Sequence, residues 1–278
     1  MQIKEIIQIT RGKMDYYVTR KEDLTRCMND DTTSKDCKHY CNQEIVKADK
    51  NIDYYSSLLE ILNKEWGLIA IPVLILGESG SGKSTSMRNF EPEEVSVFNV
   101  ASKPLPFKKK LPKMNKANYM SIEKALSKPA KKCYVIDDSQ YLMAFEMFDR
   151  AKETGYNKFT DIALSFRNLI TYIVTAVPDD VIVYFLHHVE TTDTGKVKAK
   201  TSGKMIDNQL TLEGLFSIVL LCKTDGTDHK FITQSDGYTT AKSPMDMFPL
   251  EIDNDLKLVD KAIREYYELN TNNESEEC

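Results

Sequence analysis

Short apolar runs recur along the second part of the chain, and each has the length of a β-strand. The first, Leu68–Leu76, is continuous, which is typical of a strand covered on both faces. Helical patterns over about 140–152 and 160–177 separate several of the later runs. Strands that alternate with helices predict parallel βαβ units, and therefore an α/β fold with a mainly parallel central sheet flanked by helices. The later runs are Val95–Val100, Cys133–Ile136, Val181–Leu186 and Phe216–Cys222.

The chain on either side of this core has other patterns. Residues 1–66 are largely polar, with apolar positions at helical spacing over about 51–66, so we expect a mostly helical N-terminal extension. Phe216–Cys222, a turn and Lys230–Thr233 predict a late β-hairpin, and a helix is expected over about 254–269. The acidic tail is expected to be disordered. The expected divisions are 1–66, a core at 67–269 and a tail at 270–278.

Composition is that of a globular protein. The 278 residues are 41% hydrophobic and 28% charged, which is enough apolar material for a sizeable core. No apolar run approaches the roughly 18 residues that span a bilayer, and the N-terminus lacks the pattern of a signal peptide. We therefore expect a cytoplasmic protein with no membrane partner. The formal net charge of −5 argues against general coating of nucleic acid, but it leaves room for local basic loops.

A glycine-rich segment follows the first apolar run. Its glycines let the backbone wrap closely around phosphate oxygens, and a helix expected from about Lys83 adds a positive N-terminus. In the pattern G-x-x-x-x-G-K-[ST], Lys83 reaches the β- and γ-phosphates and Ser84 ligates Mg²⁺. The segment therefore predicts a site for ATP and Mg²⁺. Its residues are Gly77, Glu78, Ser79, Gly80, Ser81, Gly82, Lys83 and Ser84, with Thr85 next.

Two carboxylates follow the strand-like run Cys133–Ile136. Asp137 is suited to hold Mg²⁺ through water, as the Walker B carboxylate does. Asp138 lies where many such ATPases carry the residue that polarises the attacking water. The alternative for each carboxylate is a cap on the next helix. With Lys83, the pair predicts catalysis of ATP hydrolysis.

Three later segments resemble the RecA-like ATPases of bacteriophages, which are compact P-loop proteins found with recombination and single-strand annealing genes. The resemblance covers about residues 68–269 and implies a RecA-like P-loop NTPase fold. It also implies a homo-oligomer, in a ring or a filament, that acts on single-stranded DNA in the cytoplasm of a bacterial host. An annealing or single-strand-binding protein is a candidate partner. The segments are Ile136-Asp137-Asp138-Ser139-Gln140-Tyr141-Leu142, Gly203-Lys204-Met205 and Thr240-Ala241-Lys242-Ser243-Pro244-Met245-Asp246-Met247-Phe248.

The same resemblance implies roles for residues late in the core. A histidine followed two residues later by glutamate makes His188 the expected sensor of the γ-phosphate, with a satisfied strand-end histidine as the alternative. Lys242 matches a basic residue that reaches the γ-phosphate of a neighbouring subunit, and a surface lysine is the alternative. The loop that contacts DNA in RecA-like proteins corresponds to Thr191–Lys204, whose basic residues are Lys196, Lys198, Lys200 and Lys204.

A second basic stretch, Lys103–Lys116, has Lys108, Lys109 and Lys110 at its centre and Phe107 beside them. Lysines neutralise phosphates and an adjacent aromatic ring can stack on an exposed base, so this stretch is a second candidate for nucleic-acid binding. A solvated loop stiffened by prolines is the alternative.

Four potential metal ligands lie close together in the N-terminal extension, namely Cys27, Cys37, His39 and Cys41. Thiolates and an imidazole can bind Zn²⁺ tetrahedrally. The spacing is not one of the common zinc patterns, so reduced residues without metal are favoured over zinc. Cys133 and Cys222 lie in apolar runs and are expected to be buried thiols.

Other functions stay open on sequence alone. An AAA+ remodeller or helicase loader normally carries an arginine in a helical lid after the core, whereas this chain has only Arg264 late in the sequence. A small-molecule kinase would need an arginine-bearing lid over the phosphates. A nucleotide-dependent switch, or an inhibitor of host defence, would bind ATP with little turnover, and only Asp138 argues against it.

Overall fold

The computed structural model describes residues 3–30, 34–66, 70–155, 157–201 and 211–269. The chain divides into two compact units, each described by itself below. The helical unit is Met1–Ile69 with Val174–Pro178, and the sheet unit is Ala70–Ile173 with Asp179–Cys278. None of the helices in the described ranges has the length and hydropathy needed to cross a bilayer.

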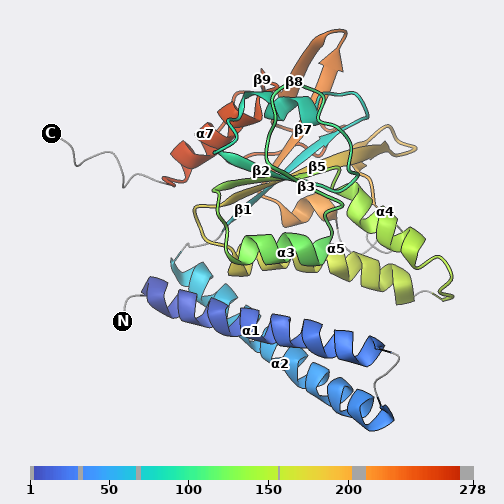
Figure 1. The fold of residues 1–278 in the computed structure, drawn as a ribbon. Helices are drawn as coiled ribbons and strands as arrows, with labels where there is room; N and C mark the ends of the chain where they lie inside the picture. The colour runs from blue at the N-terminus through green and yellow to red at the C-terminus, as the bar shows by residue number, and fades with distance from the viewer. Residues whose placement is uncertain (1–2, 31–33, 67–69, 156, 202–210, 270–278) are drawn as a thin grey trace. The chain divides into compact units, whose positions relative to one another are not determined.

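Two long helices, α1 (Ile3–Asn29) and α2 (Lys35–Trp66), make up most of the helical unit and pack along each other (Figure 1). Their contact is narrow and partly polar: Arg20 pairs with Glu44 at 3.3 Å, and Met14 and Ala48 are buried. The helix expected over about 51–66 is thus the second half of α2. Residues 35–50 are helical as well, because a helix with a single partner needs only a thin apolar stripe.

A nine-stranded sheet forms the centre of the other unit. Its order is β3-β2-β4-β5-β1-β7-β8-β9, with β6 paired to β5. The strands from β3 to β7 in this order are parallel, and β6, β8 and β9 pair antiparallel. The bounds are β1 Ile71–Gly77, β2 Val95–Asn99, β3 Lys113–Asn115, β4 Cys133–Asp137, β5 Ile182–Thr191, β6 Val197–Ala199, β7 Ile218–Asp225, β8 Asp228–Ile232 and β9 Glu251–Asp253.

Helices cover both faces of this sheet. Figure 1 shows α3 (Tyr119–Ser127) and α5 (Asn157–Ala176) along one face and α7 (Leu256–Tyr266) on the other. Successive side chains of a strand point to opposite faces of the sheet, so each strand contributes apolar side chains to a hydrophobic core on either face. The predicted α/β class and mainly parallel sheet flanked by helices are confirmed. The described residues also form the 3₁₀ segments η1 (Ser84–Asn89) and η2 (Leu212–Leu215), and α4 (Gln140–Asp149).

Individual residues illustrate the two cores. Ile75 of β1 belongs to the cluster that contains Val259 and Ile263 of α7. On the opposite face, the rings of Phe166 from α5 and Phe185 from β5 lie 5.9 Å apart. Burial on both faces explains why these strands read as continuous apolar runs rather than alternating ones.

The late part of the sheet departs from the predicted boundaries. β7 and β8 form the expected hairpin. The strand predicted to end at Leu186 continues to Thr191, because β6 turns back and pairs with its last residues. Residues 238–240, which follow the turn at Ser235, form no strand, and Lys242 makes an isolated bridge to Val219 before β9 begins. The acidic tail, Gly203–Met205 and the first two residues of the run Leu68–Leu76 lie outside the described residues.

Candidate functional site

The carboxyl ends of β1, β5 and β4 meet at one edge of the sheet, because the three strands are parallel neighbours. β5 lies in the middle, with Gly77 of β1 level with His188. The glycine-rich loop leaves β1 here, and the acidic pair stands at the end of β4. The fold therefore brings together the loop, the carboxylates and the histidines that the sequence pointed to separately.

The side chain of Lys83 folds back over the loop. Its Nζ donates hydrogen bonds to the carbonyl oxygens of Gly77 and Glu78, both at 2.7 Å. Lys83 is buried, and this burial lowers the pKa of its ammonium group to about 8. Carbonyl oxygens do not neutralise the charge, so the ammonium group remains a strong partner for an anion.

Glycine is required at two positions of the loop. Gly80 and Gly82 have φ of 82° and 96°, in the left-handed region that other residues rarely adopt. A Cβ on Gly82 would lie 2.9 Å from Nδ1 of His229, and one on Gly77 would lie 2.4 Å from Oγ of Ser81. Larger residues would force the loop outward, so its close wrapping depends on these glycines.

The loop rests on residues that the sequence did not connect with it. The carbonyl oxygen of Ser81 accepts from Cys222 Sγ at 2.8 Å and lies 2.9 Å from Nδ1 of His229. Asn254 Nδ2 in turn donates to Cys222 Sγ at 3.0 Å. Cys222 is buried, as predicted, and so is Cys133. These supports come from β7, β8 and the residue after β9, distant segments that only the folded sheet brings to the loop.

The helix after the loop is shorter than predicted. Residues Ser84–Asn89 form a 3₁₀ helix, and the chain turns extended at Phe90. Ser and Thr residues at its start compete for backbone hydrogen bonds, and Pro92 disfavours helical geometry at Glu91. The expectation that an α-helix begins near Lys83 and contributes its N-terminal dipole is therefore wrong.

Ser84 and Asp137 form the closest side-chain contact between the loop and β4. Ser84 Oγ donates to Asp137 Oδ1 at 2.7 Å, although the two residues are 53 positions apart. Burial raises the pKa of Asp137, and the hydrogen bond from Ser84 opposes part of that rise. A hydroxyl beside a carboxylate offers the oxygen ligands that Mg²⁺ prefers. These two residues fit the predicted metal site.

Asp138 adopts an uncommon backbone conformation, with φ of 60°. This conformation is accessible to Asp but costs on the order of 1 kcal/mol or more. Its Oδ2 accepts from Lys103 Nζ at 2.8 Å, and its Oδ1 lies 3.2 Å from His188 Nε2. Burial acts to raise the pKa of Asp138, but the hydrogen bonds from His188 and Lys103 outweigh it and lower the pKa below its usual value.

The helix-cap alternative for these carboxylates is wrong. α4 begins after Ser139, and no side chain caps its first turn. The carboxylate of Asp138 instead faces Lys103 and His188. Lys103 belongs to a stretch that the sequence assigned to solvent or nucleic acid, so its place beside Asp138 was not foreseen.

The two histidines at the end of β5 have different surroundings. His188 is half-buried, and its ring meets that of Tyr141 edge-on at 5.7 Å. His187 is fully buried, and burial lowers the pKa of its imidazole to about 4. Its Nε2 donates to the carbonyl of Lys200 at 2.8 Å, and its Nδ1 accepts from Ser139 Oγ at 2.9 Å. His187 thus joins β5 to Lys200, the residue directly after β6.

His187 was missed as a candidate, although the sequence contained a signal for it. Adjacent residues of a strand point to opposite faces, so a pair of histidines at a strand end places one on each side. The neutral imidazole of His187 also has both ring nitrogens occupied. This arrangement makes it a fixed connection rather than a proton donor at neutral pH.

An open cavity of about 410 Å³ lies beside the loop. His188, the predicted sensor, Lys103, which pairs with Asp138, and Lys200, which follows β6, all border this cavity. The residues that matter on its wall are Glu78, Ser79, Lys103, Tyr141, His188 and Lys200.

No family model matches the chain, and no curated protein matches it. The resemblance to phage RecA-like ATPases stays a prediction. The case for a function therefore depends on the geometry of the candidate site.

The lysines predicted to contact DNA lie on a hairpin rather than on an open loop. β5 and β6 form this hairpin, with Gly195 at φ of 79° in its turn. Lys196 and Lys200 are exposed, and Lys198 forms an ion pair with Glu190 at 2.9 Å. Lys204 lies outside the described residues.

The second basic stretch is only partly available to a ligand. Lys108 and Lys110 are exposed, while Lys109 pairs with Glu91 at 2.8 Å. Phe107 is partly buried and packs against the hydrophobic core. Part of this ring is therefore used in packing, and its stacking on a base stays a prediction.

Lys242 lies away from the loop of its own chain. It pairs through its backbone with Val219, with both N–O distances at 2.8 Å, and Val219 is level with the middle of β1. Among the described residues, no hydrogen bond or ion pair joins the Lys242 side chain to the glycine-rich loop. Its predicted role across a subunit interface stays a prediction.

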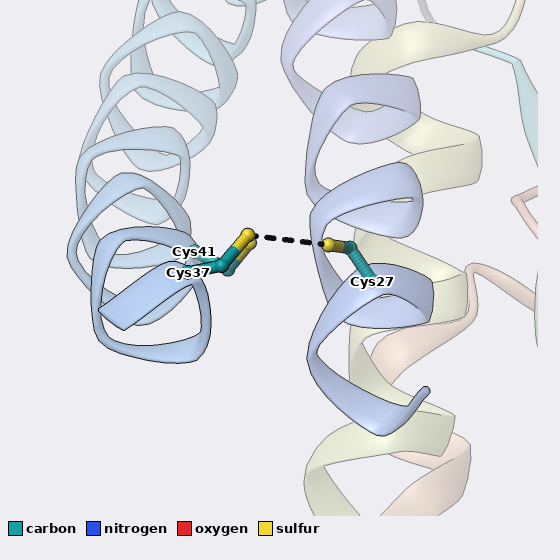
Figure 2. A group of neighbouring side chains, drawn as sticks. All are labelled: Cys27, Cys37 and Cys41. Carbon is teal, nitrogen blue, oxygen red and sulfur yellow. Dashed lines mark hydrogen bonds between the residues drawn. The ribbon is translucent and has the colours of Figure 1, made fainter. Parts of the chain in front are cut away.

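The cysteines of the helical unit gather more closely than their spacing indicated. The sulfur atoms of Cys27, Cys37 and Cys41 lie within 4.8 Å of one another (Figure 2). Burial raises the pKa of Cys41 to about 11, and hydrogen bonds with Cys27 and Cys37 add to the rise. His39 is exposed and its Nε2 lies 2.9 Å from Nε2 of Gln43. The predicted four-residue set is therefore corrected to three thiols without His39.

Proposed function

We propose that the sheet unit is a RecA-like P-loop NTPase that binds ATP with Mg²⁺ at the loop Gly77–Ser84 and hydrolyses it. The observation that carries the proposal is the 2.7 Å hydrogen bond between Ser84 Oγ and Asp137 Oδ1. Two independent sequence patterns predicted a magnesium ligand at these two residues. Their contact across the intervening strand β5 supports a single metal site.

The chain's own groups account for phosphate binding. Lys83 and the backbone N–H groups of the loop would hold the phosphates, and Lys83 would exchange its two carbonyl partners for phosphate oxygens. Ser84 and Asp137 would hold Mg²⁺, which neutralises phosphate charge when bound. The glycines at 80 and 82 keep the backbone close enough for these contacts.

Asp138 is the proposed base for hydrolysis. Its carboxylate is ionised at neutral pH and can accept a proton from the attacking water, while its lowered pKa makes it a weaker base than an ordinary aspartate. His188 bonds to Asp138 and borders the cavity, which suits it to respond to the γ-phosphate. Lys103 must loosen its ion pair before Asp138 acts as a base.

An ATP-dependent switch with little turnover is the second candidate. The ion pair between Asp138 and Lys103 favours it, because a carboxylate that already accepts from an ammonium group is a weaker base. The remodeller alternative is less well supported. Arg264, the late arginine, donates to Asp260 at 2.7 Å and to the carbonyl of Asp180 at 2.9 Å, so its guanidinium is engaged within the fold.

We further propose that single-stranded DNA binds the β5–β6 hairpin and stimulates the ATPase. β5 carries His188 at the cavity and continues without a break to Thr191, where it pairs with β6 to form this hairpin. The His187–Lys200 hydrogen bond ties the far strand of the hairpin to the same point. A shift of the strand end on nucleotide binding would therefore move the lysines.

The first test measures ATP turnover with and without single-stranded DNA. Wild type is expected to be stimulated, and the double variant Lys196→Ala with Lys200→Ala is expected to lose the stimulation. Because Lys200 also borders the cavity, Lys196→Ala alone is the variant that should keep basal turnover. Each phosphate contact removed should lower the slope of log affinity against log salt by about 0.7. The matched control is Lys124→Ala with Lys128→Ala, which removes two exposed lysines elsewhere.

An ATP turnover rate that does not change when any nucleic acid is added would contradict the proposed role of DNA. Absent turnover with intact ATP binding would favour the switch. A third pair, Lys108→Ala with Lys110→Ala, decides whether the second basic stretch contributes, since both side chains are exposed.

The second test concerns Lys242 and assembly. If Lys242 reaches the phosphates of a neighbouring subunit, Lys242→Ala alone should lower kcat on the order of 10³-fold, the size of effect known for such residues. Random mixing with Lys83→Ala subunits in equal amounts should restore about a quarter of wild-type turnover, because a quarter of head-to-tail interfaces are then complete. Mixtures that stay as inactive as the separate variants would assign Lys242 to the surface.

A further inference from the structure

The helical unit contains a group of side chains that the proposed ATPase does not use. Cys27 lies near the end of α1, and Cys37 and Cys41 lie at the start of α2. Positions i and i+4 of a helix share a face, so Cys37 and Cys41 project together toward Cys27 (Figure 2). The three thiols therefore meet because the two helices fold back on each other.

The spacing of the sulfur atoms suits one small thiophilic cation. Cys27 Sγ and Cys37 Sγ are 3.9 Å apart, and all three sulfurs lie within 4.8 Å of one another. With Zn–S bonds of about 2.3 Å, the sulfurs of a tetrahedral zinc site lie about 3.8 Å apart. A cation between the thiols thus requires shifts of about 1 Å or less, which rotation of the side chains supplies.

We propose that Cys27, Cys37 and Cys41 bind one Zn²⁺ through three thiolates. Cys41 is buried, Cys27 is half-buried and Cys37 is exposed, so the cluster opens to solvent on one side and an ion can enter. That open side leaves the fourth coordination position to water or another small ligand. His39 is not a ligand, because it is exposed and hydrogen-bonds to Gln43.

The proposed ion would hold together the last turns of α1 and the first turns of α2. Elsewhere the helices are held by exposed or half-exposed ion pairs such as Lys21–Asp49 and by the stacked rings of Tyr17 and Tyr55, 5.9 Å apart. Exposed ion pairs contribute little to stability. A ligand that binds only the folded helix pair stabilises it by mass action, so zinc would act as a structural clamp.

The test uses the full chain, stripped with a chelator under reducing conditions and then titrated with Co²⁺ and Zn²⁺. We expect one Co²⁺ per chain, with the near-ultraviolet thiolate-to-cobalt absorption of a sulfur-rich site, and its loss when Zn²⁺ displaces the cobalt. Cys27→Ser and Cys41→Ser should each lower bound zinc from about one to below about a tenth per chain. Far-ultraviolet circular dichroism checks that both variants keep their helices.

Two matched controls separate zinc binding at these three thiols from binding at His39 and at the proposed ATP site. His39→Ala should bind zinc as wild type does, since the imidazole lies outside the cluster. Lys83→Ala should also bind one zinc, so failure of the ATPase proposal and failure of the zinc site are distinguishable. Less than about a tenth of a zinc per wild-type chain, or full binding by Cys27→Ser, would overturn the proposal.

Discussion

Replacing Lys83 by alanine is expected to lower kcat/KM for ATP on the order of 10³-fold, which corresponds to about 4 kcal/mol. The ammonium group is buried at the base of the loop and donates only to carbonyl oxygens of Gly77 and Glu78 in the contacts of the described residues. Loss of a buried charge contact of this kind costs about 2–5 kcal/mol. Steady-state turnover and titration of a fluorescent ATP analogue measure the effect.

Lys124→Ala is the matched control, because it also removes a lysine but lies exposed on α3, outside the site. It should bind the analogue and turn over ATP like wild type. If Lys83→Ala binds the analogue with unchanged affinity, the loop is not a phosphate site.

The pKa of Lys83 adds a pH dependence to the same prediction. The free protein has a pKa of about 8 at Lys83, so the side chain is charged below that pH and neutral above it. ATP affinity should therefore fall as pH rises through about 8, by up to about tenfold per pH unit. Lys83→Arg, whose guanidinium stays charged, should bind more weakly but with a flat profile over this range. A flat wild-type profile would mean that the ammonium charge does not contribute.

Asp137→Asn is expected to lower kcat on the order of 10²–10³-fold, the size of loss seen when one preorganised electrostatic contact is removed. Asparagine has nearly the same shape, and its side-chain oxygen can still accept the hydrogen bond from Ser84. The change therefore removes charge without disturbing the loop. Turnover measured against Mg²⁺ concentration should lose its steep dependence on the metal.

Two comparisons sharpen this experiment. Ser84→Ala removes the other predicted oxygen ligand and should weaken Mg²⁺ dependence in the same direction. Ser121→Ala removes a hydroxyl at the start of α3, where it caps that helix, and should leave the metal dependence unchanged. Wild-type kinetics in Asp137→Asn would exclude this carboxylate as the partner of the metal.

Local patterns predicted the strand ends of the candidate site well. The glycine-rich loop and Asp137 each follow a run of buried apolar residues, and the carboxyl ends of neighbouring parallel strands share one edge. Each of these two signals consists of residues close together in the sequence, namely a strand and the residues that directly follow it. They need no knowledge of which strands pair.

Residues that reach the site from distant segments were not predictable in this way. Lys103 meets Asp138 across 35 positions, and His229 meets Ser81 across 148. Neither pair has a local motif. The hairpin of β5 and β6 was also missed. The polar stretch after Leu186 is a strand only because β6 satisfies its backbone groups. The short η1 shows the opposite error, in which a motif suggested more helix than Pro92 permits.

β5 runs from the buried core into an exposed hairpin, so substitutions in its two parts have different consequences for the fold. Its buried half, up to Leu186, is fixed between two neighbouring strands, whereas the hydrogen bonds of the turn at 192–196 run within the turn itself. Residues of this turn can therefore be exchanged without repacking the sheet. Under the proposed function, such exchanges would alter the preference for single-stranded DNA and leave the side chains at the strand end in place.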